Sequence, residues 1–416
     1  RGDNDVRAVF NEPLDDSLST LSFPSQVNHI YFGYSTFNLP IEPGDIQHSI
    51  TRLSLSMRFN HPLKIGSIPN SVTTLHIGRS YNHPLEHGII PDSVTDLVLG
   101  THFDHPIKRG DLPSSLKILN VGGLNHILTP GALPSSLLDI TFVRYTHRLV
   151  HGTLPASLTM VRLAPYYAHV IEPGDLSPSL RTLRVGDGYN FGFIPCGLPG
   201  TLTRLKLGFT YKQSLTKGAL PNTLIALNLG YSYNFKLEIG HLPPSLRRLK
   251  LGPSFNQQIH SGELPPSLNQ LSIGISFLQQ LSSDVMPSSL TSLRVDNLQF
   301  LDLTAPCTFD HCNIQQLILD FDSSSDRFII PRNAQFGGHV SRLILERYPF
   351  YAPEPDVFRQ FISSGIQSMH FGNGLVHKID NDGNNILIMD SNSCMFFITL
   401  DKLVNHATDI FKKPVY

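Results

Sequence analysis

The sequence predicts a mainly β fold, an open right-handed solenoid of about sixteen turns with a parallel concave sheet and a convex side poor in helix. Two observations carry this prediction. An apolar anchor residue recurs about every 22 residues, and each anchor opens a short alternation of apolar and polar residues. Length alone would suggest two or three globular domains for 416 residues. The repeats predict one stack with a continuous core instead.

The anchor residues mark the turns in order. They are Val27, Ile50, Val72, Val94, Leu116, Leu137, Leu158, Leu180, Leu202, Leu224, Leu246, Leu268 and Leu290, with looser turns at Ile314, Val340 and Ile366. In one turn, Val72, Leu75 and Ile77 are spaced as L-x-x-L-x-L, which indicates a half-buried strand. Gly78 ends this strand, and Pro91 fixes the backbone before the next one. Each unit is too small to bury its apolar face alone, so we expect the units to stack.

The repeat pattern also predicts the organisation of the chain. Residues 1–26 form an N-terminal cap or truncated repeat, 27–313 the regular repeats, 314–374 divergent longer repeats and 375–416 a C-terminal cap. Within the last two segments we expect strands at Ile386–Met389 and Met395–Leu400, and short helices at Asp356–Ser363 and Lys402–Phe411. Asp380–Asn384 resembles the start of a calcium loop, but Ser391 stands where the closing glutamate belongs, which favours a hairpin turn.

Two further columns are expected to be structural. Asparagine recurs at one repeat position, where its amide is expected to pair backbone groups inside the coil. The members are Asn38, Asn60, Asn82, Asn125, Asn190, Asn234 and Asn256, with Asp104 as a substitute. The neighbouring aromatic residues are expected to stack from turn to turn. They are Phe37, Phe59, Tyr81, Phe103, Tyr189, Tyr211, Tyr233, Phe255 and Phe277.

At these residues the chain resembles a known family. The blocks Phe59–Leu63, Tyr81–Leu85 and Phe255–Ile259, with the recurrent Leu-Pro-x-Ser-Leu, resemble FNIP repeats, which are related to leucine-rich repeats. The resemblance covers about Val27 to Leu290 and implies a leucine-rich-repeat-like solenoid used for protein–protein interaction. Some members of the family resemble ubiquitin-ligase substrate receptors with an upstream F-box. The segment 1–25 is too short for an F-box, and Phe10–Leu14 resembles another repeat, so we expect further sequence upstream.

No motif points to catalysis, a cofactor or a metal. The sequence has no phosphate loop, no nucleophile elbow and no paired Cys/His signature, so we expect a chain that is not an enzyme. The four cysteines are too few for a disulfide framework, and the spacing of Cys307, His311 and Cys312 matches no zinc signature. No apolar run is long enough for a membrane-spanning helix.

Histidines occupy one position in six successive turns. They are His61, His83, His105, His126, His147 and His169. The favoured interpretation is a turn residue that packs and hydrogen-bonds locally, and the alternative is a pH-sensitive or metal-binding ridge. Phe191, Gln213 and Gln257 stand at the same position in later turns, so the position does not require histidine chemistry.

The candidate binding site lies on strand positions that point out of the sheet. Two and four residues after the anchor, the early turns carry mixed residues, whereas later turns become basic. The predicted partner-binding residues are Arg162, Arg184, Arg204, Lys206, Arg248, Lys250 and Arg294. Such a band suits an acidic or phosphorylated peptide, because arginine pairs bidentately with carboxylate and phosphate. The alternative is that these side chains only keep the sheet solvated.

These patterns predict a protein-interaction scaffold that binds its partner on the concave face. One form of this role is the substrate-recognition part of a ubiquitin-ligase receptor. The alternative is a non-enzymatic structural or adhesive component of a surface, matrix or viral particle. A net charge of −1 does not favour nucleic acid as the partner. We expect a cytoplasmic location, with an extracellular or particle-associated one as the alternative.

Overall fold

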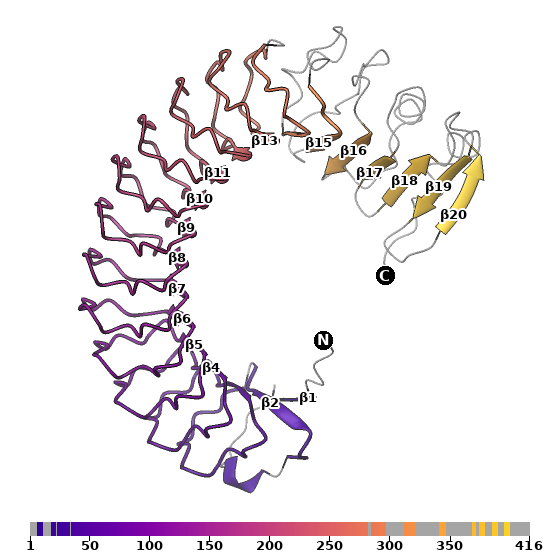
Figure 1. Ribbon diagram of the computed structural model, residues 1–416. Coiled ribbons are helices and arrows are strands. Elements are labelled where there is room, and N and C mark those ends of the chain that lie inside the picture. Colours follow the sequence, from indigo (N-terminus) through magenta and orange to yellow (C-terminus); the bar gives the residue numbers. More distant parts are fainter. Residues whose placement is uncertain are drawn as a thin grey trace. The chain divides into compact units, whose positions relative to one another are not determined.

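The computed structural model divides the chain into two compact units. Unit 1 comprises Arg1–Tyr211 and Gly218–Leu224, and unit 2 comprises Lys212–Lys217 and Ile225–Tyr416. The structure describes residues 6–10, 18–21, 23–33, 35–281, 284–296, 312–320, 341–346, 368–371, 374–378, 385–389 and 395–399. Each unit is built from short strands joined by loops (Figure 1).

Unit 1 is a stack of parallel strands. Its elements are β1 (Val6–Val9), the 3-10 helix η1 (Leu18–Thr20), β2 (Val27–Tyr31), β3 (Arg52–Ser54), β4 (Thr74–His76), β5 (Asp96–Leu99), β6 (Ile118–Val121), β7 (Asp139–Phe142), β8 (Met160–Arg162), β9 (Thr182–Arg184) and β10 (Arg204–Lys206). Consecutive strands pair in register, so that Leu53 lies opposite Leu75 and Leu75 opposite Leu97. The strands form one layer, and their loops project away from it (Figure 1).

Unit 2 also begins with parallel strands, but its last strands pair antiparallel. Its strands are β11 (Ala226–Asn228), β12 (Arg248–Lys250), β13 (Gln270–Ile273), β14 (Ser292–Val295), β15 (Gln316–Asp320), β16 (Arg342–Glu346), β17 (Ser368–Phe371), β18 (Gly374–Lys378), β19 (Asn385–Met389) and β20 (Met395–Thr399). Strands β11 to β17 pair in parallel, whereas β17 to β20 pair antiparallel.

The fold class is as the sequence predicts, a parallel β-solenoid in which the described residues hold no helix other than η1. The regular coil contains thirteen strands, β2 to β14, against the sixteen turns expected. The difference arises because the loops after residue 296 lie outside the described residues, although β15, β16 and β17 occur where the last three turns are expected.

The C-terminal elements are confirmed where the structure describes them. Strands β19 and β20 coincide with the two strands expected in the cap. Antiparallel pairing of β18 with β19 agrees with the hairpin expected around Asp380. The helices expected at Asp356–Ser363 and Lys402–Phe411 lie outside the described residues.

The aromatic column fills the core as expected. Phe59 and Tyr81 are fully buried, and their rings lie parallel with centroids 6.1 Å apart. Tyr189 and Tyr211 stack in the same way at 6.4 Å. Tyr145 and Tyr167 are also buried members of this group, which the sequence analysis did not include.

Hydroxyl groups of the repeated serines link each turn to the preceding anchor. Six serines donate to the carbonyl of the anchor one turn earlier, at 2.7 to 2.8 Å; they are Ser71, Ser93, Ser136, Ser157, Ser267 and Ser289. These serines therefore link successive turns of the coil.

The asparagine column pairs backbone groups, but not inside the coil. The side-chain oxygen of Asn60 accepts from the backbone N–H of Asn82 at 2.9 Å, and that of Asn82 accepts from Asp104 at 3.1 Å. Asn60 and Asn82 are exposed, so the expectation of a buried column is wrong. The turn carries these groups at its surface, because the aromatic residue before each asparagine already fills the core.

Candidate functional site

The candidate site is the open face of the parallel sheet, which strand geometry separates from the core. Side chains alternate between the two faces of a strand. In β10, Leu205 is buried whereas Arg204 and Lys206 on either side of it are exposed. In β12, Leu249 is buried between exposed Arg248 and Lys250. In these two strands the positions two and four residues after the anchor therefore point out of the core, whereas Ser54 in β3 and Thr182 in β9, at equivalent positions, are buried.

In unit 1 the basic residues come together on β8, β9 and β10. Arg162 lies opposite Arg184, and Arg184 lies opposite Lys206, so the three occupy one column across neighbouring strands. Paired strands lie about 4.8 Å apart, which brings these cations close together. The Nε of Arg204 donates to the hydroxyl of Thr182 at 3.1 Å, and the Arg204 side chain is exposed.

Arg162 is already neutralised within the sheet. Its Nη1 donates to both carboxylate oxygens of Asp139, at 2.9 and 3.2 Å, and to the hydroxyl of Thr141 at 3.1 Å. Both members of the ion pair are partly buried. Arg162 therefore belongs to the predicted face, but it is not available to a ligand in the way that Arg184 is.

In unit 2 the basic residues are grouped mainly on β12. Arg248 and Lys250 are exposed, and their neighbours on β13 are the neutral Gln270 and Ser272. Arg294 on β14 is held by Asp296, whose carboxylate accepts from its Nε at 3.0 Å.

The seven predicted residues thus divide into two groups. Arg162 and Arg294 are tied to carboxylates of the protein. Arg184, Arg204, Lys206, Arg248 and Lys250 are exposed cations, and none of the ion pairs found within the described ranges involves them. The sequence contains Asp139 and Asp296 but does not show that they bind Arg162 and Arg294. Only the strand register and the side-chain positions in the structure show these two ion pairs.

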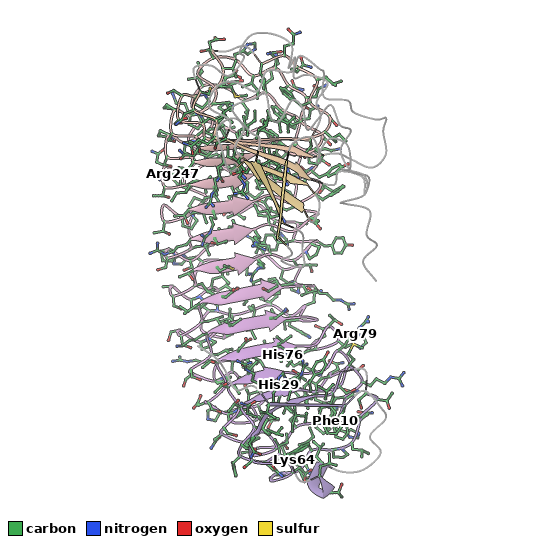
Figure 2. The ribbon with its side chains drawn as sticks, turned by 90° about the vertical axis from the view of Figure 1, so that its right-hand side faces the viewer. Phe10, His29, Lys64, His76, Arg79 and Arg247 are labelled. Atoms are coloured by element: carbon green, nitrogen blue, oxygen red, sulfur yellow. The ribbon has the colours of Figure 1, made fainter. Side chains whose placement is uncertain are left out.

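Figure 2 views the sheet with its strands running across the page. His29 and His76 lie on the strands, on the open face of unit 1, and Arg79 lies at the edge where β4 ends. Arg247 lies at the edge where β12 begins. The open face of unit 1 is therefore mixed in its early strands and basic in β8 to β10.

The histidine column has the local role that the favoured interpretation assigns. In each of the six histidines, Nε2 lies 2.7 to 3.1 Å from a backbone carbonyl oxygen of the preceding turn. The ring of His83 also packs edge-on against the buried Tyr81, with centroids 5.5 Å apart. Across the described part of the chain, no group of three His, Cys, Asp or Glu side chains is placed to hold a metal ion.

A shallow hollow of about 580 Å³ lies on the loops of unit 2. Its lining includes Lys217, Lys236, Glu238 and His241, and Nε2 of His241 lies 3.3 Å from a carboxylate oxygen of Glu238. The hollow lies on loop residues outside the strands that carry the basic face. Among the described helices, none is long and apolar enough to cross a membrane.

Comparison with known proteins agrees with this architecture. The FNIP repeat model matches residues 37–80, 81–123, 211–254 and 255–296. The chain contains FNIP repeats. Each matched FNIP segment spans about two turns of the coil, and together they include the aromatic and asparagine columns on both sides of residues 124–210.

The fold of this FNIP-repeat chain is similar to that of CroV588, described as a circular leucine-rich-repeat protein. The two are 22% identical with a TM-score of 0.58, over 88% of this chain and 69% of the other. The likeness shows the fold, a repeat solenoid of the leucine-rich-repeat type. No curated protein matches the sequence.

Proposed function

We propose that this FNIP-repeat chain is a non-enzymatic scaffold that captures an acidic or phosphorylated peptide segment of a partner protein on the open face of its sheet. The observation that supports this most directly is that each unit carries exposed cations that lack an acidic partner among the described residues, on β9 and β10 in unit 1 and on β12 in unit 2. Guanidinium and ammonium groups in this state bind carboxylate or phosphate with charge-assisted hydrogen bonds.

The basic face is a local feature and not a consequence of composition. The chain carries 32 Lys and Arg against 33 Asp and Glu. The positive and negative charges of the whole chain are therefore nearly balanced, so a group of cations without neighbouring carboxylates departs from the overall composition. Within the same sheet, Arg162 and Arg294 are neutralised by Asp139 and Asp296. The remaining cations are thus available to an external anion.

The test is charge reversal with a matched control. The triple variant Arg184→Glu, Lys206→Glu, Lys250→Glu is compared with Arg58→Glu, Lys108→Glu, Lys217→Glu, in which three exposed loop cations are reversed. Binding is measured by fluorescence anisotropy with labelled 12-residue peptide pools containing Glu or phosphoserine, and with matched pools containing Gln or Ser. Only the sheet variant should lose binding to the acidic pools. Equal loss of peptide binding in both variants would show that the attraction is non-specific and would refute the proposed site.

One form of the scaffold role is substrate recognition for a ubiquitin ligase in the cytoplasm. The support is the FNIP repeat itself together with the peptide-sized basic face. We expect the full-length protein to co-purify with ligase subunits. The sheet triple variant should still co-purify with these subunits but should lose the substrate. Absence of ligase subunits from the wild-type complex would refute this form without affecting peptide capture.

A second candidate is a structural component of a surface, matrix or particle. The observation that favours it is the regularity of bonding between turns, in which serine, asparagine and histidine each pair with the preceding turn. Such bonding suits a rigid element. Recovery of the chain in an assembled particle, unaffected by the sheet triple variant, would support this candidate over peptide capture.

A further inference from the structure

Exposed aromatic side chains lie beside the basic face of unit 1, at the edge where its strands end. Tyr166, in the turn after β8, is 78% exposed, and Phe209, in the turn after β10, is 50% exposed. Most aromatic rings of the repeat are in the core; Tyr166 and Phe209 in unit 1 are exposed, as are Tyr231 and Phe235 in unit 2. Large exposed apolar side chains that gather beside a polar surface are typical of an interaction site.

Backbone bonds hold these two turns in a fixed relation. The N–H of Gly188 donates to the carbonyl of Pro165 at 2.6 Å, and the N–H of Thr210 donates to the carbonyl of Asp187 at 2.9 Å. The turns after β8, β9 and β10 are therefore stacked like the strands before them. Tyr166 and Phe209 stand two turns apart, about 10 Å at the usual strand spacing.

The turn between them carries no side chain at the position of Tyr166. Gly188 stands there, and a Cβ atom added to it would lie 2.6 Å from the carbonyl oxygen of Pro165. The tight stacking thus requires glycine. As a result, no side chain of this residue separates Tyr166 from the turn that carries Phe209.

The aromatic edge lies within reach of the exposed cations. Lys206 and Phe209 are three residues apart, so their Cα atoms are at most about 11 Å apart. Arg184 precedes Asp187 by the same number of residues. Asp187 lies on the edge, where its carboxylate accepts from the N–H of Phe209 at 3.3 Å. A negative charge at the edge disfavours an acidic group there and directs it toward the strands.

We propose that Tyr166, Gly188 and Phe209 form a specificity site for a bulky apolar side chain of an extended acidic peptide, whose acidic residue lies on Arg184 and Lys206. In the polyproline II conformation three residues span about 9 Å and every third side chain returns to the same face, so the two recognised side chains are about three positions apart. The acidic carboxylate pairs with the cations, while the apolar side chain covers the exposed rings. This inference rests on the proposed function and adds to it the sequence class of the partner.

A single-stranded nucleic acid is the competing occupant, because cations with aromatic rings also bind bases and phosphates. The charges favour the peptide. Asp187 lies on the aromatic edge, where it repels a phosphate backbone that follows the stacked bases. The chain as a whole has a net charge of −1, which supplies no general attraction for nucleic acid.

The experiment is selection from a displayed library of random 12-residue peptides on the full chain. The variant Tyr166→Ala, Phe209→Ala tests the edge, and Arg184→Glu, Lys206→Glu tests the cations. Met57→Ala is the matched control, since Met57 occupies the position of Phe209 in the turn after β3 and is 51% exposed. An unlabelled oligothymidine serves as competitor. All variants are first checked for unchanged circular dichroism.

The expected result is enrichment of peptides with an acidic residue about three positions from Phe, Tyr, Leu or Ile. The edge variant should weaken their binding at least tenfold, the size expected for loss of aromatic contacts, whereas Met57→Ala leaves it unchanged. The cation variant should abolish it.

The other outcomes overturn one idea or both. Acidic peptides without a spaced apolar residue, insensitive to the edge variant, would refute the specificity site and leave the proposed function standing. Peptides insensitive to the cation variant, or no enrichment at all, would refute both. Displacement of selected peptides by oligothymidine at lower concentration than by free acidic peptide would assign the surface to nucleic acid.

Discussion

Because several of its tyrosines are buried, we expect the protein to lose stability as the pH rises above about 10. Tyr81 is fully buried and stacked on Phe59. Burial raises the pKa of Tyr81 from 10.0 to about 12, with a smaller opposing effect of the backbone N–H of Leu63 near the hydroxyl. Tyr233 behaves in the same way, with its pKa also raised to about 12.

The direction of the effect follows from proton binding. Between pH 10 and pH 12 the unfolded chain releases the phenolic protons, whereas the folded chain retains them. The stabilisation is therefore fully present below pH 10 and is lost as the pH rises toward 12. Each such tyrosine costs about 1.4 kcal/mol of unfolding free energy per pH unit in this window.

The effect in each unit is a substantial fraction of the stability of a domain. One unit above pH 10, Tyr81 in unit 1 and Tyr233 in unit 2 each remove about 1.4 kcal/mol, against a typical total of about 5–15 kcal/mol for a domain. Burial also raises the pKa values of Tyr145, Tyr167 and Tyr189. We therefore expect cooperative alkaline unfolding in which tyrosinate absorbance rises as circular dichroism is lost.

Urea unfolding at a series of alkaline pH values measures the effect directly. Tyr81→Phe should reduce the slope of unfolding free energy against pH by about 1.4 kcal/mol per unit, whatever its effect at neutral pH. Tyr166→Phe is the control, because that side chain is 78% exposed and should leave the slope unchanged. Ionisation of all tyrosines near pH 10 with the circular dichroism intact would refute the reasoning.

Three comparisons of variants test the turns themselves by urea unfolding at neutral pH. Cys196 has a φ of 64°, at the position where Gly174 and Gly218 have 89° and 81°, so Cys196→Gly should stabilise the protein by about 1 kcal/mol; destabilisation would contradict this. A Cβ atom at Gly208 would lie 2.0 Å from the carbonyl oxygen of Gly186, so Gly208→Ala should lower the unfolding free energy by about 3 kcal/mol. A Cβ atom at Gly218 would meet no atom within 4 Å, so Gly218→Ala should lower it by only about 1 kcal/mol, the cost of its positive φ. Asn82→Leu should cost about 1 kcal/mol by removing the acceptor for Asp104, whereas Asn82→Asp retains it and should be neutral; equal losses would show that the acceptor is not the cause.

The fold was predictable because every turn repeats the same solution. Leu53, Leu75 and Leu97 lie opposite one another, so one correct reading of a single turn applies to the next. Tyr145 and Tyr167 were missed because Thr146 and Ala168 stand where asparagine usually follows the aromatic residue. Alignment on the anchors alone would have found them.

The site was predictable only in part. Alternation along the strand is enough to place Arg184 and Lys206 on the open face. It does not show that Arg162 is bound by Asp139, because that contact joins residues of neighbouring strands that are not directly opposite. The exposure of Tyr166 beside Gly188 likewise depends on how closely successive turns stack.

The histidine column shows why structural and functional positions separate in this repeat. Nε2 of His83 lies 3.0 Å from a backbone carbonyl oxygen of the preceding turn, and because a carbonyl oxygen only accepts, this nitrogen is the donor. In later turns Gln257 donates instead to the side chain of Asn234 at 3.1 Å. The position therefore requires a donor of suitable reach. In the described part of the chain, the side chains of Arg184 and Lys206 donate no hydrogen bond to the preceding turn. The repeat therefore does not dictate which residue stands at these open-face positions. For this reason we propose the charges that the repeat does not need, and not the histidine column, as the partner-binding residues.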